Sequence, residues 1–205
     1  MAEVRTGLRR LLRSARPYDA LQRLVGEVRV KTEFIDRYGR IRAGERVLDI
    51  GCGTGRTLDY LPAVEYLGFD PNEAYVAAAR ARYGARGRFV CAGVESACLD
   101  GEPRSDVVLA VAVLHHLDDA AATRLFALAR ERLAPGGRLV TLDAVRTPGQ
   151  SAIARFLIDH DRGQNVRDEE GYVALARGVF RGVRSTVRHD LLRIPYSHII
   201  LECEL

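Results

Sequence analysis

Three glycines at alternate positions are the residues of this chain whose spacing most directly implies chemistry. They stand in the run Gly51-Cys52-Gly53-Thr54-Gly55, which follows the apolar stretch Val47 to Ile50 and its single acid, Asp49. A buried strand that turns through glycines into a helix brings backbone N–H groups close to a ligand, with no Cβ in the way. We therefore expect Asp49 and the five residues of the run to contact a bound ligand.

The spacing of the glycines also indicates which ligand they suit. A dinucleotide-binding loop has the pattern G-x-G-x-x-G, and this chain carries Arg56 where the third glycine of that pattern would stand. Asp49 would repel a pyrophosphate and suits a ligand end that carries an ammonium or a sulfonium. A tight turn that binds nothing is the alternative interpretation of these residues.

Asp70 is a second candidate for ligand binding. It lies nineteen positions after Gly51 and ends the stretch Val64 to Phe69, which we expect to be a strand. An ionised carboxylate only accepts hydrogen bonds, so an acid at the end of a second strand suits the hydroxyl groups of a ribose. Asp70 or Asn72 can equally cap a helix expected over 72–83, and both interpretations can hold together.

Two adjacent histidines, His115 and His116, follow the apolar run Asp106 to Leu114. Ligands of open α/β sheets bind outside the carboxyl ends of the strands, so both histidines are aimed at the expected site. An imidazole, with a reference pKa of about 6.5, suits a general base that removes the proton of a hydroxyl group. Asp143, at the end of the next expected strand, is a candidate orienting partner. The alternative is that His116 packs under the sheet edge while His115 only touches the ligand.

The segment Val47 to Gly55 resembles the first motif of the class I S-adenosylmethionine-dependent methyltransferases. The segment Leu133-Ala134-Pro135-Gly136-Gly137, before a strand, matches a later motif of the same family. The resemblance covers residues 45–143 strongly and the two flanks weakly. It implies S-adenosyl-L-methionine as the cofactor and S-adenosyl-L-homocysteine as the product. The adjacent histidines also occur in small-molecule O-methyltransferases that this chain is similar to.

The resemblance implies further cofactor contacts after the other strands. The family often places an acid after the third strand, where it meets the adenine amino group, whereas this chain has Gly93. The adenine contact then falls either to the backbone of Gly93 and Val94 or to Glu95. The remaining residues expected around the cofactor are Pro71, Asn72, Val111, Ala112 and His115.

Alternating strands and helices must position these residues. We expect strands at 47–50, 64–69, 88–92, 106–114 and 138–143, and a helix over 119–133 that turns Leu125, Leu128 and Ala129 inward. Two final strands with no helix between them predict an antiparallel pair. The predicted fold class is α/β: a Rossmann-like, doubly wound, seven-stranded, mostly parallel sheet with an antiparallel last strand and an N-terminal helical extension.

The 205 residues fit a single methyltransferase domain, 1–205. We expect an N-terminal helical cap over 1–42, the cofactor-binding core over 45–143, and helices with a closing hairpin over 147–205. The resemblance places the N-terminal helices over the cofactor, where Tyr18 and Gln22 either line a site or lie on the surface. His160 and Asp161, in a polar loop, are weaker catalytic candidates.

Charge and composition exclude several classes of partner. The net charge of +4 is carried almost wholly by arginine, with Lys31 as the one lysine, and no basic cluster is interleaved with aromatic residues as nucleic-acid binding would require. Four cysteines without zinc-ligand spacing predict reduced thiols, no metal site and a cytoplasmic location. No apolar run is long enough for stable membrane insertion. The arginine-rich first sixteen residues suit a solvated helix, weak membrane-surface contact or an organellar presequence.

These patterns favour an S-adenosylmethionine-dependent methyltransferase that acts on a small-molecule acceptor, at oxygen. A nucleotide-dependent oxidoreductase is the alternative enzyme class, and Arg56 argues against it. A module that binds S-adenosylmethionine without catalysis is the other alternative. The sequence predicts neither the identity of the acceptor nor the oligomeric state.

Overall fold

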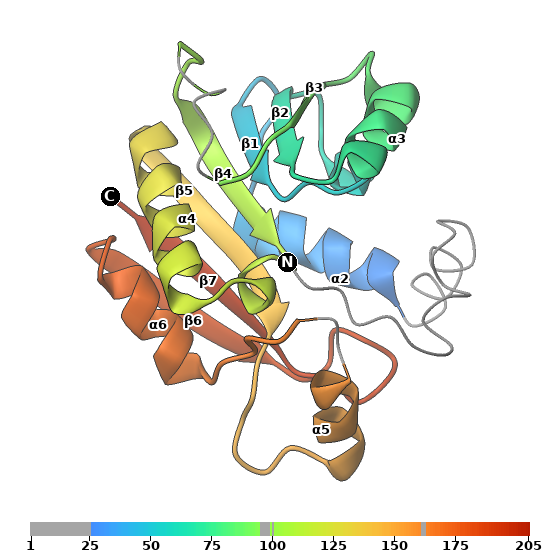
Figure 1. Ribbon diagram of the computed structural model, residues 1–205, viewed down its shortest axis with the longest axis vertical. Helices are drawn as coiled ribbons and strands as arrows, with labels where there is room; N and C mark the ends of the chain where they lie inside the picture. Colours follow the sequence, from blue (N-terminus) through green and yellow to red (C-terminus); the bar gives the residue numbers. More distant parts are fainter. Residues whose placement is uncertain (1–25, 95–98, 100, 161–162) are drawn as a thin grey trace.

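A seven-stranded sheet crosses the molecule in the order β3-β2-β1-β4-β5-β7-β6 (Figure 1). The computed structural model describes residues 26–94, 99, 101–160 and 163–205. The first five strands are parallel, and β7 runs antiparallel to both β5 and β6, which confirms the predicted fold class. The strands are β1 (Arg46–Ile50), β2 (Glu65–Asp70), β3 (Arg88–Cys91), β4 (Ser105–Val111), β5 (Leu133–Ala144), β6 (Gly182–Arg188) and β7 (His198–Glu204).

Helices cover both faces of the sheet, because side chains of a strand alternate between its two faces. Leu48 and Ile50 of β1 pack against one group of helices, and Val47 packs against the other. The first group is α4 (Asp119–Arg132) and α6 (Glu169–Arg177), and the second is α2 (Glu27–Glu33), the π-helix η2 (Phe34–Gly39) and α3 (Glu73–Tyr83). The other helices of the described residues are η3 (Arg56–Tyr60), η5 (Leu114–His116) and α5 (Ala152–Asp159).

Side-chain caps fix where the helices begin. Asn72 caps α3 by accepting from the backbone N–H of Tyr75 at 3.2 Å, so the cap falls to Asn72. Asp118 caps α4 in the same way. The inward face of α4 is Leu125, Phe126 and Ala129, all fully buried, while the expected core residue Leu128 is only partly buried.

Two elements differ from the expectation in detail. The segment after the glycine loop is a 3₁₀-helix, because only five residues separate Gly55 from the extended Leu61 and the following Pro62. Strand β5 begins at Leu133, so the Pro-Gly-Gly segment lies inside its span. The helical cap is described only from residue 26 onward, and the expected helices before it lie outside the described residues.

Two arginines hold α2 and η2 against the rest of the molecule. Arg138 of β5 donates to the carbonyl oxygen of Gly39 from Nε at 2.9 Å and from Nη2 at 2.6 Å. Arg188 of β6 donates to Glu33 at 2.9 Å and to the Tyr38 hydroxyl at 3.2 Å. Figure 1 shows α2 beside the C-terminal end of β4. The cap is therefore fixed at the edge of the sheet where ligands of this architecture bind.

The N-terminal ends of the strands form a surface away from the glycine loop. A hollow of about 440 Å³, lined in part by Arg46, Glu65, Arg88 and Ser105, lies at the N-terminal ends of the strands, opposite the glycine loop.

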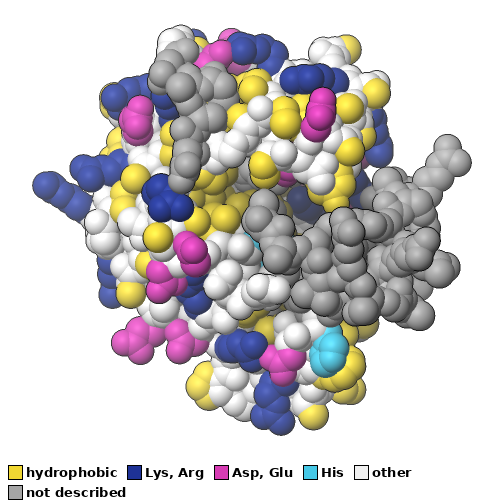
Figure 2. All heavy atoms as spheres, viewed as in Figure 1, with side chains coloured by type: hydrophobic (Ala, Val, Ile, Leu, Met, Phe, Trp, Pro, Cys, Tyr) yellow, Lys and Arg dark blue, Asp and Glu magenta, His cyan; other side chains and the backbone are white. Residues whose placement is uncertain are grey.

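Helix α5 carries exposed apolar side chains. Figure 2 shows apolar side chains at the bottom of the view, where Figure 1 places this helix. Ile153 and Phe156 of that helix are 59% and 58% exposed. No helix of the described residues is both long enough and apolar enough to cross a membrane.

Candidate active site

The glycine loop joins β1 to η3 through left-handed backbone. Gly51, Gly53 and Gly55 have φ angles of 72°, 54° and 76°, a conformation that costs other residues about 1–2 kcal/mol each. The N–H groups of Gly51 and Cys52 donate to the Phe69 carbonyl at 2.8 and 3.0 Å, which ties the loop to the end of β2. No atom of the described residues lies within 4 Å of a Cβ placed on Gly53, so the loop is open there.

Around that opening the loop packs tightly on the protein. A Cβ on Gly51 would meet Val113 Cγ2 at 2.6 Å, and one on Gly55 would meet Phe89 Cε1 at 2.8 Å. Cys52 is buried, and burial raises the pKa of its thiol well above the ordinary value. Of the predicted loop contacts, Cys52 therefore has only its backbone to offer a ligand, whereas Thr54 is half-buried.

Asp70 is held directly beside the loop. Its Oδ2 accepts from the N–H of Gly53 at 3.0 Å, and its Oδ1 accepts from the N–H of Asn72 at 2.8 Å. Burial raises the pKa of this carboxyl, and the two N–H donors partly offset that effect. Pro71 and Asn72 are exposed next to it. The structure thus brings Asp70 to the open side of the glycine loop, where the sequence predicted a ribose acceptor.

Asp49 lies on the inner side of the loop and is 1% exposed. Its Oδ2 accepts from the Tyr66 hydroxyl at 2.6 Å, whereas its Oδ1 makes no hydrogen bond within the described residues. Burial raises the pKa of Asp49, although Tyr66, the Lys31 ammonium and the Thr57 hydroxyl all favour its charged form. A buried, incompletely paired acid therefore stands behind the loop.

Helix α2 contributes residues that the motifs did not single out. Lys31 donates from Nζ to Thr57 Oγ1 at 3.3 Å, and Glu27 pairs with Arg56 Nη2 at 2.7 Å. Both contacts join the N-terminal cap to η3, directly after the glycine loop. The one available sequence signal was that Lys31 is the single lysine of an arginine-rich chain.

The ends of β3 and β4 carry the other predicted cofactor contacts. Gly93 is exposed, and a Cβ there would meet no described atom within 4 Å. Val94 is half-buried, and Glu95 lies outside the described residues. Val111 ends β4, and Ala112 after it has a φ of 59°, an uncommon angle for a residue with a side chain.

His115 and Asp143 form a buried pair across the ends of β4 and β5. Asp143 Oδ1 lies 2.8 Å from the ring Nδ1 of His115 and accepts from its backbone N–H at 3.2 Å. The side chains are 6% and 0% exposed. A carboxylate at Nδ1 favours the tautomer that protonates Nδ1 and leaves the lone pair on Nε2. The pair has the geometry of an oriented general base.

His116 occupies the same 3₁₀ turn but is exposed, so it does not pack under the sheet edge. Its ring centroid is 4.2 Å from that of His115. The weaker candidate His160 stacks on Phe156 at 4.0 Å at the end of α5. Asp161, Tyr18 and Gln22 lie outside the described residues.

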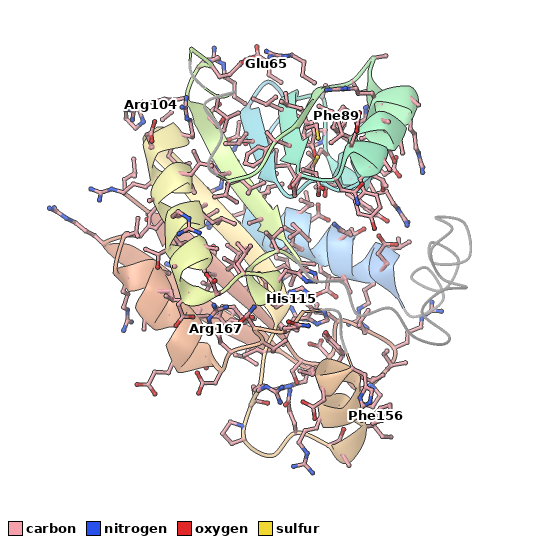
Figure 3. The ribbon with its side chains drawn as sticks, in the orientation of Figure 1. Glu65, Phe89, Arg104, His115, Phe156 and Arg167 are labelled. Carbon is pink, nitrogen blue, oxygen red and sulfur yellow. The ribbon has the colours of Figure 1, made fainter. Side chains whose placement is uncertain are left out.

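Arg167 anchors the histidine turn and was not predicted. Its guanidinium donates to the carbonyl oxygens of Leu114 and Leu117 at 3.1 and 2.7 Å, and it pairs with Asp119 at 2.7 Å. Figure 3 shows Arg167 close to His115, and Phe156 further away on α5. Because its partners are backbone carbonyls and the opening of α4, no local pattern marks this arginine.

The described site fits the adenosyl and amino-acid parts of a sulfonium cofactor. The glycine loop is open at Gly53, Asp70 faces it as an acceptor, and the acid Asp49 lies behind it. The methyltransferase domain family matches residues 48–139, from β1 into β5. This match assigns residues 48–139 to a methyltransferase domain, and with the fold it supports a class I methyltransferase whose cofactor is S-adenosyl-L-methionine.

The proteins that this chain is similar to include methyltransferases and a biosynthetic protein. The chain is 31% identical to phosphoethanolamine N-methyltransferase 1 of Triticum aestivum over 74% of its own length, and it spans about a third, 32%, of that relative. The structure of the pyocyanin biosynthetic protein PhzM has a TM-score of 0.72 at 18% identity, over 96% of this chain and 60% of that one. The mitomycin 7-O-methyltransferase MmcR has a TM-score of 0.66 at 20% identity, over 98% and 61%.

Proposed function

We propose that this chain transfers the methyl group of S-adenosyl-L-methionine to an oxygen of a small-molecule acceptor, with His115 as the general base. The observation that carries the proposal is the buried contact between His115 Nδ1 and Asp143 Oδ1 at 2.8 Å. A base oriented by a carboxylate is of use when the acceptor atom must lose a proton, as a hydroxyl group must.

The proposed steps follow from the two side chains. Asp143 holds the Nδ1–H of His115, so that Nε2 takes the proton of the acceptor hydroxyl and Asp143 stabilises the imidazolium that forms. When bound, S-adenosylmethionine would supply an electrophilic methyl carbon with a neutral thioether as its leaving group. Arg167 and Asp143 keep the histidine turn in place, because positioning supplies most of the rate in a displacement of this kind.

For the cofactor we propose contacts from each predicted segment. Asp70 would accept from the ribose hydroxyls, and the glycine loop with Asp49 would meet the amino-acid end. Gly93, Val94 or Glu95 would meet the adenine. The other proposed contacts are Pro71, Asn72, Val111 and Ala112, together with the backbone of Cys52 and Thr54.

Methylation of nitrogen in a phosphorylated amine is the second candidate. It is favoured by the 31% identity to the wheat phosphoethanolamine N-methyltransferase and by the net charge of +4, which suits an anionic acceptor. An amine can reach the reactive state by losing its proton to solvent, so this candidate depends less on His115. The two candidates therefore differ in how strongly they need the base.

The experiment begins with purified chain, methyl-labelled S-adenosylmethionine and fractionated cell extract, with mass spectrometry of any labelled product. With the acceptor in hand, His115→Ala is expected to lower turnover at least a hundredfold while S-adenosylhomocysteine affinity stays within twofold. Gly53→Val is the binding control, since its side chain would fill the open side of the loop. A chain that binds the cofactor but labels no acceptor would be a binding module, and an unchanged turnover of His115→Ala would overturn the assignment of the base.

We also propose a single domain over 1–205 and a cytoplasmic location. The described cysteines Cys52, Cys91 and Cys203 are free thiols, which supports a reducing compartment. The arginine-rich N-terminus, for which the sequence predicts weak contact with a membrane surface, lies outside the described residues.

A further inference from the structure

Asp143 uses only one of its two carboxylate oxygens to hold His115. Oδ1 lies 2.8 Å from the ring Nδ1 and accepts from the backbone N–H at 3.2 Å. Oδ2 is buried and makes no hydrogen bond within the described residues. The whole side chain is 0% exposed. Because a buried carboxylate oxygen without a donor is costly, we expect a donor at Oδ2.

Thr141 presents a hydroxyl group to the same region of the core. It lies two residues before Asp143 on β5, and side chains two positions apart in a strand point to the same face of the sheet. Thr141 is 0% exposed, and its Oγ1 makes no hydrogen bond in the part of the chain that the structure describes. Two positions along a strand span about 6.6 Å, a spacing that one water molecule can bridge between two short polar side chains.

The other neighbours on this face supply no donor to Oδ2. The partner residues in the adjacent strands are apolar: Ala110 of β4, and Ile199 and Leu201 of β7. The buried Tyr172 of α6 donates its hydroxyl proton to the carbonyl oxygen of Ala144 at 3.0 Å. Burial and the charge of Asp143 raise the pKa of Tyr172, which places the two side chains near each other. Tyr172 therefore has an oxygen that can accept near Asp143 but no proton left to donate.

We propose that a buried water molecule bridges Thr141 Oγ1 and Asp143 Oδ2, and that Thr141 acts through it as a positioning residue for His115. The water accepts from the Thr141 hydroxyl, donates to Oδ2 and gives its second proton to the Tyr172 hydroxyl oxygen. These make up the about three hydrogen bonds that are typical of a buried water. With Oδ2 held, the carboxylate cannot rotate about its Cβ–Cγ bond, so Oδ1 stays on the ring Nδ1. The positioning role rests on the proposed function, whereas the water site itself does not.

A high-resolution crystal structure of the wild-type chain tests the water site directly. We expect an ordered water at about 2.6–3.2 Å from both Thr141 Oγ1 and Asp143 Oδ2. In Thr141→Val, which replaces the hydroxyl by a methyl group of similar size, this water should be lost. A wild-type structure without an ordered water between the two oxygens would overturn the proposal, whatever the behaviour of any variant.

Turnover and NMR test the positioning role. Thr141→Val is expected to lower turnover by about ten- to a hundredfold, the loss typical of a hydrogen bond to a charged group, while S-adenosylhomocysteine affinity stays within about twofold. The proton resonance of the His115 Nδ1–H, which its hydrogen bond to Asp143 moves downfield, should broaden as the carboxylate gains freedom to rotate.

Thr141→Ser separates the effect of the hydroxyl from that of packing. Serine keeps the hydroxyl and loses a methyl group, so it should recover most of the turnover, whereas a packing role predicts that valine is tolerated better than serine. Thr186→Val, at a half-buried position of β6, is the matched control and should keep the wild-type turnover. Wild-type turnover in Thr141→Val, or an equal loss in Thr141→Ser, would refute the positioning role. A wild-type chain that methylates no acceptor would instead refute the proposed function, and the crystal structure would still decide the water site.

Discussion

Gly163 packs so closely against His115 that a Cβ on this glycine would overlap the imidazole Cδ2. The contact joins the segment before α6 to the histidine turn after β4. Asn165 reinforces it by donating from its N–H to the His115 carbonyl at 2.9 Å. The ring that we assign as the base is therefore enclosed from two sides, by Asp143 and by a backbone that must lack a side chain.

Gly163→Ala should consequently displace either the imidazole or the loop. We expect the free energy of unfolding to fall by about 1–3 kcal/mol, as for other substitutions that overfill a packed site, and turnover to fall with it. Urea denaturation and turnover measure the two effects. Gly182→Ala is the control, since its Cβ would lie at an ordinary 3.4 Å from Glu204 Cβ and should be tolerated. Full activity and stability of Gly163→Ala would contradict the observed packing.

The orienting role of Asp143 can be tested with asparagine, which has nearly the same shape but no charge. Asp143→Asn should lower turnover by about a hundredfold, because a neutral amide stabilises the imidazolium less and can hold the wrong tautomer. Cofactor affinity in calorimetry should stay within about twofold, since Asp143 contacts His115. Asp118→Asn makes the same chemical change at the cap of α4. Asparagine caps a helix as well as aspartate does, so this variant should keep the wild-type turnover and cofactor affinity. A similar loss in both variants would refute the orienting role.

Much of this site could be predicted because its parts are local. The glycine loop, Asp70 and Asp143 each end a strand whose apolar pattern is plain, and parallel strands bring their carboxyl ends to one edge. Which histidine meets Asp143 was not predictable, since it depends on how the 3₁₀ turn of η5 faces His115 inward and His116 outward. The periodicity of side chains in a strand or an α-helix does not predict which residue of so short a turn is buried.

The partners from distant segments were also out of reach of the sequence. Lys31 meets a residue 26 positions away, and Arg167 meets a carbonyl 50 positions away. Their targets are a hydroxyl and backbone oxygens, which carry no sequence signature. Only tertiary packing brings such groups together. The fold therefore follows from local sequence patterns, whereas the contacts of Lys31 and Arg167 do not.

Ala112 carries the strain of the turn after β4. Its φ of 59° is unfavourable for alanine, so Ala112→Gly should raise the free energy of unfolding by about 0.5 kcal/mol, after the greater freedom of glycine in the unfolded chain is deducted. Ala127→Gly, at an exposed position inside α4, should lower it by about 0.5–1 kcal/mol. Equilibrium unfolding in urea compares the two variants with the wild type. Changes of the same sign would show that Ala112 is not strained.

The buried carboxyl of Asp49 predicts a pH dependence of stability. Its pKa is raised in the folded protein above the ordinary 3.8, so the folded state holds the proton more tightly than the unfolded state does. The stability that this proton contributes is present below pH 3.8 and is lost as the pH rises toward the folded pKa. Relative to Asp49→Asn, the wild type should therefore lose stability as the pH increases above about 4. Parallel urea titrations at several pH values, without cofactor, measure the difference, and a constant or opposite trend would refute the burial cost.

A substitution of Arg167 tests whether this arginine positions His115 through the turn that both residues contact. In Arg167→Lys the ammonium cannot reach Leu114, Leu117 and Asp119 together, because lysine lacks the planar fork of donors. We expect the free energy of unfolding to fall by about 1–3 kcal/mol and turnover to fall, while affinity for S-adenosylhomocysteine is retained. The imidazole resonances of His115 should broaden as the turn loosens. Arg155→Lys, at an exposed position of α5, is the control. If Arg167→Lys melted earlier but kept the wild-type turnover and a sharp His115 signal below its transition, Arg167 would support the fold without positioning the base.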